Sequence, residues 1–408
     1  MKSSLELPLR SLWRQPRRTS IMLSGIGVGI IALLLAGGFI EWIFWAMRES
    51  TILFRLGHIQ VVRPGYLDRG AADPYRFLLP HSVDELEVLA KLPGIKVVAP
   101  RLSFNGLLSH GDTTIGFIGE GIDPEKEKAF KPDLSIQEGV GLDPNQPLSA
   151  VIGNGLAANL GIKSGDKVVL LANTVSGGIN AVELNVVGVF STANKAFDDS
   201  ALRIPLITAE KLLRVSGAHR WTVLLDDTSD TKKILKRIQQ LFIEKTGEFQ
   251  LIPWYDLADF YNKTVRLFSQ QMNVLGGIIG FMILLGISNV LIMNVMDRTS
   301  EIGTLMALGL KRLEIVRLFL AEALMLGVIG SVLGVSIGWG LAAIISAIGI
   351  PMPPAPGTST GYTAEIFITG PLIAKAVLVA LISTFLASVF PAWKASRLVI
   401  VEALRKSR

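Results

Sequence analysis

The sequence of 408 residues contains no cysteine and only four histidines. Without cysteine, the chain can form neither a disulfide nor a thiolate site, so a domain outside the cytoplasm must be held by its core alone. The histidines are scattered and lack the spacing of metal ligands; they are His58, His81, His110 and His219. We therefore expect no metal on this chain.

The sequence also lacks the motifs of enzymes that use nucleotides or hydrolyse esters. Gly155–Ser164 is the nearest match to a phosphate-binding loop, but it has no adjacent Gly-Lys-Ser/Thr. Gly25, Gly27 and Gly29 lie inside an apolar run, which excludes a dinucleotide fingerprint, and no G-x-S-x-G elbow is present. We expect no catalytic residue and no cofactor on this chain, so the energy for any work must come from a partner.

Long apolar runs are what the sequence has instead. Half of the residues are hydrophobic and the mean hydropathy is +0.47, and a bilayer core needs about 20 consecutive apolar residues. Four runs meet this length and predict membrane spans at residues 21–47, 271–296, 318–348 and 371–391. The net charge of +6 could suggest nucleic acid, but Lys and Arg that flank apolar runs are better explained as topology signals.

The positions of these cations predict the orientation of the spans. Basic residues cluster before the first span, between the second and third, and after the fourth. We therefore expect residues 1–20, 297–317 and 392–408 in the cytoplasm, and residues 48–270 and 349–370 outside. A cleavable signal peptide is the alternative for the first span. Its apolar run is too long and no A-x-A site follows, which favours a retained anchor.

The segment 48–270 predicts a mixed α/β domain. Alternating or β-branched runs indicate strands at 58–62, 96–99, 113–118, 168–172, 183–190 and 222–225, and helices are expected at 83–92, 154–160, 208–215 and 229–245. Residues 47–56 and 257–271 look helical and partly polar, which predicts a stalk. The outer loop 349–370 is rich in Pro and Gly and is expected to be irregular. Asp226, Asp227 and Asp230 fit a helix N-cap better than a calcium loop.

Glycines spaced four residues apart recur in the predicted spans. Such spacing makes a smooth stripe on one helix face, and the residues concerned are Gly25, Gly29, Gly276, Gly280, Gly330, Gly334 and Gly338. Glycine stripes of this kind are equally consistent with helix packing within one subunit and with an interface between two subunits. Few polar residues interrupt the spans; Glu41 and Lys375 lie near their outer ends, and Glu322 could pair with a nearby Arg. This argues against a proton or ion relay.

Between the second and third runs lies a short amphipathic segment, from Asp297 to about Glu322. Its apolar residues recur at helical spacing; they are Ile302, Leu305, Met306, Gly309 and Leu313. A helix there could neither span a bilayer nor form a domain. We expect it to be a surface that a cytoplasmic partner grips, or, alternatively, a helix that lies on lipid.

Three stretches resemble the FtsX-like permeases of ABC transporters. EIGTLMALGLKRLEIVRLFLAEALMLGVIGSVLGVSIG resembles the family's coupling helix and third span, FPAWKASRLVIVEALR its terminal signature, and LRSLWRQPRRTSIMLSGIGVGI its entry segment. VIGNGLAANLGIKSGDKVVLL and LNVVGVFSTANKAFDDSALRIPL are similar to its extracytoplasmic domain. GHIQVVRPGYL and FIGEGIDPEKE look closer to the lipoprotein-releasing, LolC/LolE-type branch than to the macrolide exporters.

This resemblance implies an α-helical inner-membrane protein with four transmembrane helices and a mixed α/β extracytoplasmic domain on a helical stalk. It implies that a cytoplasmic ABC ATPase dimer binds ATP and Mg and grips each of two permease subunits, which are two copies or paralogues. By position, the ATPase contact would comprise Glu301, Ile302, Gly303, Leu305, Ala307, Leu308 and Gly309. The motion would pass through the stalk to the outer domain, as mechanotransmission.

The resemblance further implies a lipoprotein or other amphiphile as substrate, handled at the outer leaflet. One alternative is a signalling or scaffold protein that gates a periplasmic hydrolase or senses a peptide. Another is a membrane-anchored enzyme with its site in residues 48–270, against which the missing catalytic constellation argues.

Overall fold

The computed structural model describes residues 16–399 except 71, 80–83, 131–134, 193–194, 243–246 and 354–360. His81 lies outside these residues. The chain forms two compact units. The helical unit comprises Met1–Trp45, Thr264–Pro351 and Thr363–Arg408, and the sheet unit comprises Ala46–Lys263 and Met352–Tyr362, each within the described residues.

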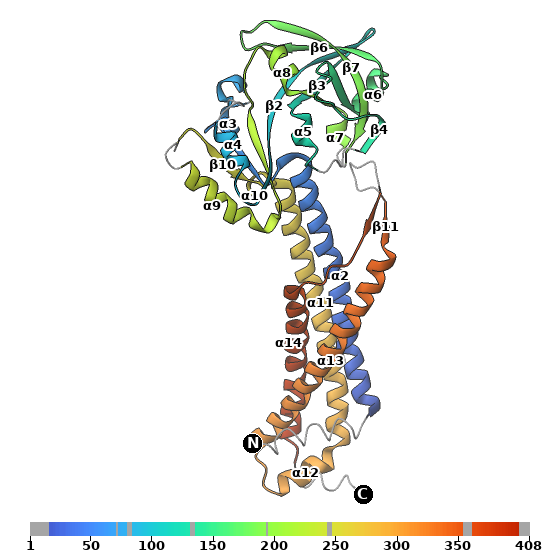
Figure 1. Cartoon of the computed structure of the whole chain (residues 1–408). Helices are drawn as coiled ribbons and strands as arrows, with labels where there is room; N and C mark the ends of the chain where they lie inside the picture. Colours follow the sequence, from blue (N-terminus) through green and yellow to red (C-terminus); the bar gives the residue numbers. More distant parts are fainter. Residues whose placement is uncertain are drawn as a thin grey trace. The chain divides into compact units, whose positions relative to one another are not determined.

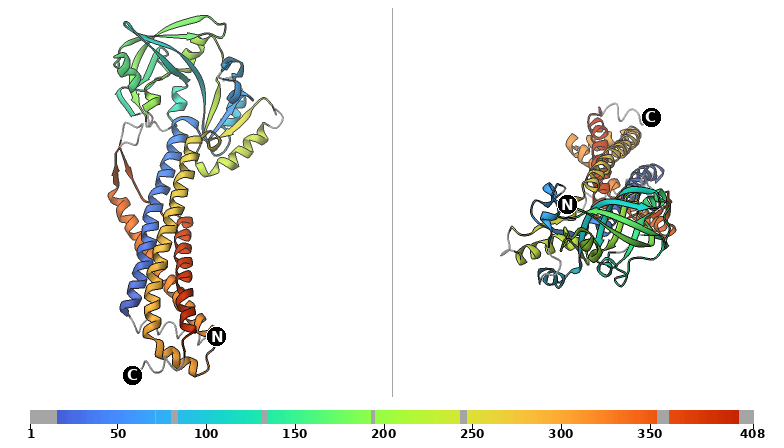
Figure 2. Two further views of the ribbon diagram at one scale, coloured as in Figure 1. Left: turned by 180° about the vertical axis from the view of Figure 1, so that it is seen from behind. Right: turned by 90° about the horizontal axis from the view of Figure 1, so that it is seen from above.

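Four helices in the described part of the chain are long and apolar enough to cross a membrane. They are α2 (Pro16–Thr51), α11 (Asp259–Asp297), α13 (Arg312–Ile348) and α14 (Gly370–Ser396). All four contribute to one apolar core of the helical unit, and α13 and α14 are in extensive contact. The helices lie side by side in both orientations of the molecule (Figures 1 and 2).

The helices extend beyond the predicted spans. Both α2 and α11 continue into residues of the sheet unit, and the predicted stalk segments are helical except at Ala258, between α10 and α11. Helix α14 passes through Pro391 instead of ending there. A proline has no N–H to donate and disturbs a helix, but Pro391 is buried, and neighbouring helices in a bundle can satisfy the freed backbone groups.

Most of the predicted glycine stripes pack within this chain. A Cβ on Gly330 or Gly334 would lie 2.9 Å from the Cβ of Ile26 or Ile30 on α2, respectively. A Cβ on Gly338 would lie 3.0 Å from Leu34 Cδ1. Side chains of the same subunit likewise approach Gly29, Gly276 and Gly280, whereas Gly25 has nothing within 4 Å. The close contact between α13 and α2 therefore depends on the missing side chains.

The sheet unit is built on one ten-stranded sheet, part of which closes on itself (Figure 1). Its order is β10-β1-β9-β2-β3-β8-β5-β7-β4, and β6 pairs with both β2 and β7, so six of the strands form a ring. Pairs β3–β8 and β5–β7 are parallel. The strands are β1 (Ile59–Val62), β2 (Ile95–His110), β3 (Thr113–Ile122), β4 (Ser135–Gly139), β5 (Ser149–Gly153), β6 (Lys167–Asn173), β7 (Ile179–Ser191), β8 (Ala201–Pro205), β9 (Arg220–Leu225) and β10 (Gln250–Pro253).

The hydrophobic pattern explains which faces are buried. In β6, Val168, Leu170 and Ala172 are buried in the core, while the alternate residues are exposed or, at Leu171, half-buried. Helix α9 (Thr231–Leu241) buries Ile234 and Ile238, four residues apart, and turns its Lys and Arg side chains to solvent. The remaining α-helices are α3 (Tyr66–Arg69), α4 (Asp84–Ala90), α5 (Pro124–Glu127), α6 (Asn154–Leu160), α7 (Lys195–Asp198), α8 (Leu206–Leu213), α10 (Trp254–Leu257) and α12 (Thr299–Ala307).

The predicted strands and helices of this unit are present, within shifts at their ends. Strands β4, β5, β8 and β10 were not predicted. All five residues of β5 and of β8 are buried, so these strands show no alternation.

The prediction of an irregular loop at 349–370 was wrong, because β11 (Ile350–Met352) pairs with β12 (Tyr362–Ala364).

Candidate functional site

The segment after α11 folds as a helix, a tight turn and the start of α13. Helix α12 ends where Gly309 adopts a φ of 98°, in the left-handed region that glycine tolerates. Gly309 N donates to Met306 O at 3.1 Å, and Leu310 N donates to Leu305 O at 3.2 Å, which together make a Schellman motif. We call residues 305–311 the α12 turn. The prediction that one helical pattern continues to Leu313 was therefore wrong.

Helix α12 and the α12 turn expose some of the predicted ATPase-contact residues, and helix α12 buries others. Glu301, Ala307, Leu308 and Gly309 are exposed, and Leu305 is half-buried. Leu308 is 76% exposed, so this turn presents a large apolar side chain on the surface.

Ile302 and Gly303, also predicted as contact residues, are buried within the helical unit. Ile302 packs in a small apolar cluster with Ile315, Phe319 and Ala392. Because their side chains or backbone are buried, these two residues anchor α12 to its own subunit and are not on its exposed surface.

Arg298 ties α12 to the third long helix. Its Nε donates to Glu301 at 3.0 Å, and its Nη1 donates to Glu322 Oε2 at 3.4 Å. This confirms the prediction that Glu322 pairs with a nearby arginine. Glu322 lies on α13 and is only 4% exposed, so the ion pair holds the first residues of α12 against α13.

A second site of interest lies where α2 and α11 enter the sheet unit. Helix α2 is followed by one π-helical turn, η1 (Ile52–Leu56), and then by Gly57 at φ 64°. A Cβ on Gly57 would lie 2.9 Å from Val223 O of β9. Ile52, Leu224, Trp254 and other apolar side chains form a buried cluster here, which we call the root cluster. It packs η1, which follows α2 directly, against β9 and α10.

A chain of hydrogen bonds joins α2 to the same strand. Thr228 Oγ1 donates to Glu49 Oε1 at 3.2 Å, and His58 Nε2 lies 3.0 Å from Thr228 Oγ1. Leu225 N donates to His58 Nδ1 at 3.1 Å, which places the proton on Nε2. Burial and the charge of Arg48 lower the pKa of His58 to about 4, so the ring is neutral near pH 7.

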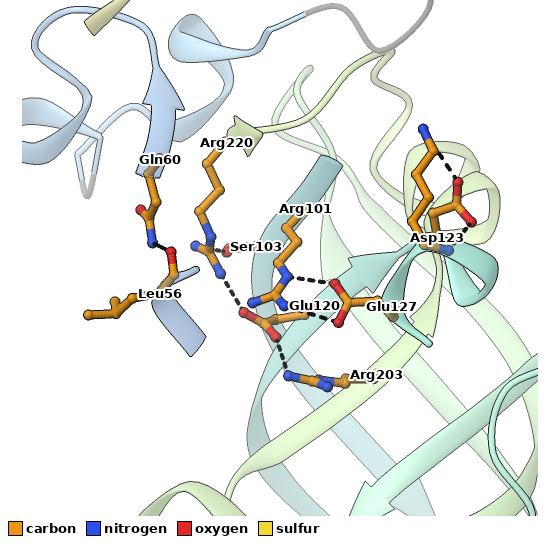
Figure 3. Close-up of polar contacts among 10 residues, drawn as sticks. Leu56, Gln60, Arg101, Ser103, Glu120, Asp123, Glu127, Arg203 and Arg220 are labelled. Atoms are coloured by element: carbon orange, nitrogen blue, oxygen red, sulfur yellow. Dashed lines mark hydrogen bonds and ion pairs between the residues drawn. The ribbon is translucent and has the colours of Figure 1, made fainter. Parts of the chain in front are cut away.

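Buried charges cross the sheet unit from strand to strand (Figure 3). Glu120 on β3 binds Arg203 of β8 at 3.2 Å and Arg220 of β9 at 2.5 Å. Arg101 on β2 forms a two-pronged pair with Glu127, at 2.7 and 3.0 Å. We call these five residues the charge row.

The charge row follows the register of the sheet. Glu120 is directly opposite Arg203 in the β3–β8 pair, and Arg101 is opposite Arg220 in the β2–β9 pair. Arg101 is fully buried; burial opposes its charge, but Glu127 and Glu120 outweigh this and raise its pKa above the ordinary value. A one-residue slip of any of these strands would separate buried charges, so the charge row fixes their pairing.

His219 lies next to the charge row and is held in one tautomer. Ser103 N donates to its Nδ1 at 3.1 Å, and its Nε2 lies 3.1 Å from Pro74 O. Burial and the neighbouring charge of Arg220 lower its pKa to about 4. Neither this ring nor the charge row was found from the sequence, because the residues are far apart along the chain and belong to no motif.

The three aspartates near 226–230 include the expected helix cap. The Asp227 side chain accepts from Ser229 N at 2.8 Å and caps the 3-10 turn before α9. The prediction of a helix cap is therefore confirmed at Asp227, whereas Asp230 makes no such capping bond.

Two family profiles match the chain and together cover most of it. The MacB-like periplasmic core domain matches residues 19–241, which is over half of the chain, and the FtsX-like permease C-terminal domain matches residues 273–400. The chain belongs to the FtsX-like ABC transporter permeases. It combines four membrane-spanning-type helices with the α/β domain of this family.

Relatives from both branches of the family are similar to the chain. "Macrolide export ATP-binding/permease protein MacB" of Bdellovibrio bacteriovorus is 26% identical over 95% of this chain. The chain spans 59% of the length of that protein. "Lipoprotein-releasing system transmembrane protein LolC" of Xylella fastidiosa is 25% identical over 77% of this chain and 78% of its own length. Because both match at nearly the same identity, the preference for the lipoprotein-releasing branch stays a prediction.

Solved structures of the same kind resemble part of the chain. The periplasmic region of MacB from Actinobacillus actinomycetemcomitans gives a TM-score of 0.37 with 17% identity, over 52% of this chain and 97% of that chain. The extracellular domain of the transporter YknZ from Gram-positive bacteria gives a TM-score of 0.36 with 15% identity, over 48% of this chain and 98% of that chain.

Proposed function

We propose that this permease is moved by a separate cytoplasmic ABC ATPase, which binds ATP and Mg and grips the α12 turn. The observation that carries the proposal is the exposed Leu308 on a turn whose backbone is fixed by a Schellman motif. An exposed apolar side chain on a rigid turn can fill a partner's groove at little cost in conformational entropy. The Arg298–Glu322 pair and the buried Ile302 would transmit a push on this turn to α13.

The same proposal gives the two long helices α2 and α11 the role of levers. Each runs from the helical unit into residues of the sheet unit. The root cluster and the Glu49–Thr228–His58 hydrogen bonds attach the end of α2 to β9. A displacement of α2 would therefore be passed to the sheet unit without any pore through the membrane.

We propose lipoproteins or other amphiphiles as the substrate, with the sheet unit in the periplasm and both termini in the cytoplasm. The match to LolC over most of both chains supports this choice. A second permease subunit, a copy or a paralogue, would complete the transporter. Purification in mild detergent followed by identification of bound proteins and lipids tests the substrate: a bound lipoprotein supports it, and a bound cell-wall hydrolase would replace transport by signalling.

The ATPase contact is tested by placing a charge on the α12 turn. Leu308→Asp should lower the ATP hydrolysis that the permease stimulates in its ATPase by at least about tenfold, because an anion in an apolar groove costs well over 1.4 kcal/mol. The variant should fold normally, since Leu308 makes little internal contact. Leu67→Asp, at a half-exposed leucine of the sheet unit, is the matched control and should retain stimulation. Equal stimulation by both variants would refute the contact.

A further inference from the structure

Helix α9 presents a dense group of positive charges on the surface of the sheet unit. Four cationic side chains occur within six residues, and the helix itself contains no acidic residue. Ile234 and Ile238 are buried on one face of the helix, and the four cations are exposed on the other. They are Lys232, Lys233, Lys236 and Arg237. A basic amphipathic helix of this kind is typical of a segment that lies at a membrane surface.

The cationic face of α9 is weakly compensated by carboxylates. Among the residues that the structure describes, Asp230 is the acidic residue that pairs with one of the four cations. It lies 3.9 Å from Lys233 Nζ, and both side chains are about half exposed or more. An exposed pair of this kind contributes little. The face therefore keeps most of its positive charge for an external anion.

The start of α9 is fixed to the last turn of α2. Thr228 Oγ1 donates to Glu49 Oε1 at 3.2 Å. Thr228 belongs to the 3-10 turn η3 (Thr228–Asp230), which leads directly into α9, and Thr231 Oγ1 donates to Thr228 O at 2.7 Å. Glu49 lies two residues beyond the predicted span 21–47, which is about 3 Å along a helix. Because each headgroup layer of a bilayer is about 5–8 Å thick, the start of α9 is held at the level of the headgroups.

The second long helix also leaves the sheet unit close to α9. Helix α9 contacts β10, and β10 leads through α10 into α11 (Figure 1). The residues 46–51 of α2 and 259–263 of α11 belong to the same compact unit as α9. A cationic surface beside both of these helices is within reach of lipid headgroups.

From these observations we propose that α9 docks on the anionic lipid headgroups of the outer leaflet. The four cations pair with lipid phosphates, and the contact holds the sheet unit against the membrane surface. Anionic lipids attract Lys and Arg within about a Debye length, which is about 8 Å at physiological salt. An acidic protein would match the same charge, but the hydrogen bond to Glu49 places α9 beside the bilayer. The proposal rests on the membrane placement of the four long helices and not on the ATPase contact.

The test measures how closely α9 approaches the lipid headgroups. Because the chain lacks cysteine, Gln240→Cys can carry a single fluorophore. Gln240 is exposed, and it lies one helical turn from Lys236 and Arg237, so the label joins the cationic face without removing a charge. The full chain is placed in nanodiscs that contain a trace of lipid with a nitroxide on its headgroup, with no ATPase and no ATP. Quenching should be at least about twofold stronger when phosphatidylglycerol is added to phosphatidylcholine. Equal quenching in the two kinds of nanodisc would overturn the proposal.

Matched variants separate a local contact from an effect of net charge. Replacing Lys232, Lys233 and Lys236 together by Gln should remove the dependence on phosphatidylglycerol. The control replaces three exposed lysines elsewhere in the sheet unit by Gln, which changes the net charge equally and should keep the dependence; they are Lys163, Lys167 and Lys195. Loss of the dependence in both triple variants, or its persistence in the first, would refute docking by α9.

The salt dependence gives an independent measure of the same contact. Raising the salt to about 1 M shortens the Debye length to about 3 Å, so the extra quenching caused by phosphatidylglycerol should disappear. Extra quenching that survives this salt concentration would exclude electrostatic docking. Because the ATPase is absent throughout, a negative result leaves the proposed ATPase contact untouched.

Discussion

The helical unit and the sheet unit are held together by different kinds of buried residues. Small residues face the interior of the helical unit: Gly330 and Gly334 bring α13 against α2, and Ala376 and Ala380 face the same core from α14. Both units bury charge, but the helical unit buries Glu322 beside Arg298, whereas the sheet unit buries Arg101, Glu120 and Arg203 together. Helices in a membrane associate by close packing of small residues, whereas the charge row fixes which strands pair.

Because of this difference, the two units should lose stability through different kinds of substitution. The helical unit should be sensitive to side-chain size and the sheet unit to charge. A unit whose strands are fixed in register by ion pairs can move as one rigid body. A displacement of an attached helix would then move the whole unit.

The largest effect is expected in the charge row. Glu120→Gln keeps the shape but removes the charge that pairs with Arg203 and Arg220, leaving buried cations without a partner. We expect the sheet unit to lose about 3–5 kcal/mol, measured as a fall in its unfolding midpoint in denaturant. Glu183→Gln, which breaks an exposed pair with Lys167, should leave the midpoint unchanged. A small effect of Glu120→Gln would show that the charge row does not hold the sheet.

The next effect is a loss of stability in acid. His219 has a pKa of about 4 in the folded chain and about 6.5 when unfolded. Above pH 6.5 the ring is neutral in both states. As the pH falls from 6.5 toward 4, only the unfolded state binds the proton, so stability falls by up to about 3 kcal/mol.

His219→Asn keeps an acceptor for Ser103 N and removes the titration. The melting temperature of this variant should therefore fall less steeply than that of the original protein between pH 6.5 and 4. His58, with a similarly low pKa, supplies the slope that remains. An identical slope in the variant would contradict a neutral, buried His219.

A smaller effect is expected in the helical unit. Gly334→Leu places a side chain against Ile30, whose Cβ would lie 2.9 Å from the new Cβ. Such overpacking costs about 1–3 kcal/mol, visible as a lower melting temperature in detergent. Gly25→Leu, which points into open space, is the control. Equal melting temperatures of Gly334→Leu and Gly25→Leu would show that the helical unit is not sensitive to side-chain size at Gly334.

Features of the fold that depend on local pattern could be predicted from the sequence. Apolar run length predicted the four long helices, and alternation predicted strands such as β6. Features that depend on contacts between residues far apart in the sequence could not be predicted. The spacing of Gly330 and Gly334 indicated a smooth face but not that Ile26 and Ile30 would meet it. Nothing in the linear order brings Glu120 to Arg203.

The candidate site shows the same division. Hydrophobic periodicity located the α12 segment, but it did not show that Gly309 ends the helix or that Ile302 and Gly303 turn inward. Those facts depend on the Schellman motif and on contacts with α13 and α14. Fewer residues are therefore exposed to a partner than the sequence predicted for the ATPase contact.

If an ATPase acting on the α12 turn moves the sheet unit, the distance between the two units must change with the state of the ATPase. Because the chain lacks cysteine, Leu148→Cys in the sheet unit and Trp339→Cys in the helical unit can be spin-labelled specifically; both positions are exposed. The distance between the labels, measured in labelled protein diluted with unlabelled protein, should change when the ATPase is trapped in its ATP-bound state. The change should be absent in a chain that also carries Leu308→Asp. An unchanged distance in the original protein during active ATP hydrolysis would show that the ATPase does not move the sheet unit.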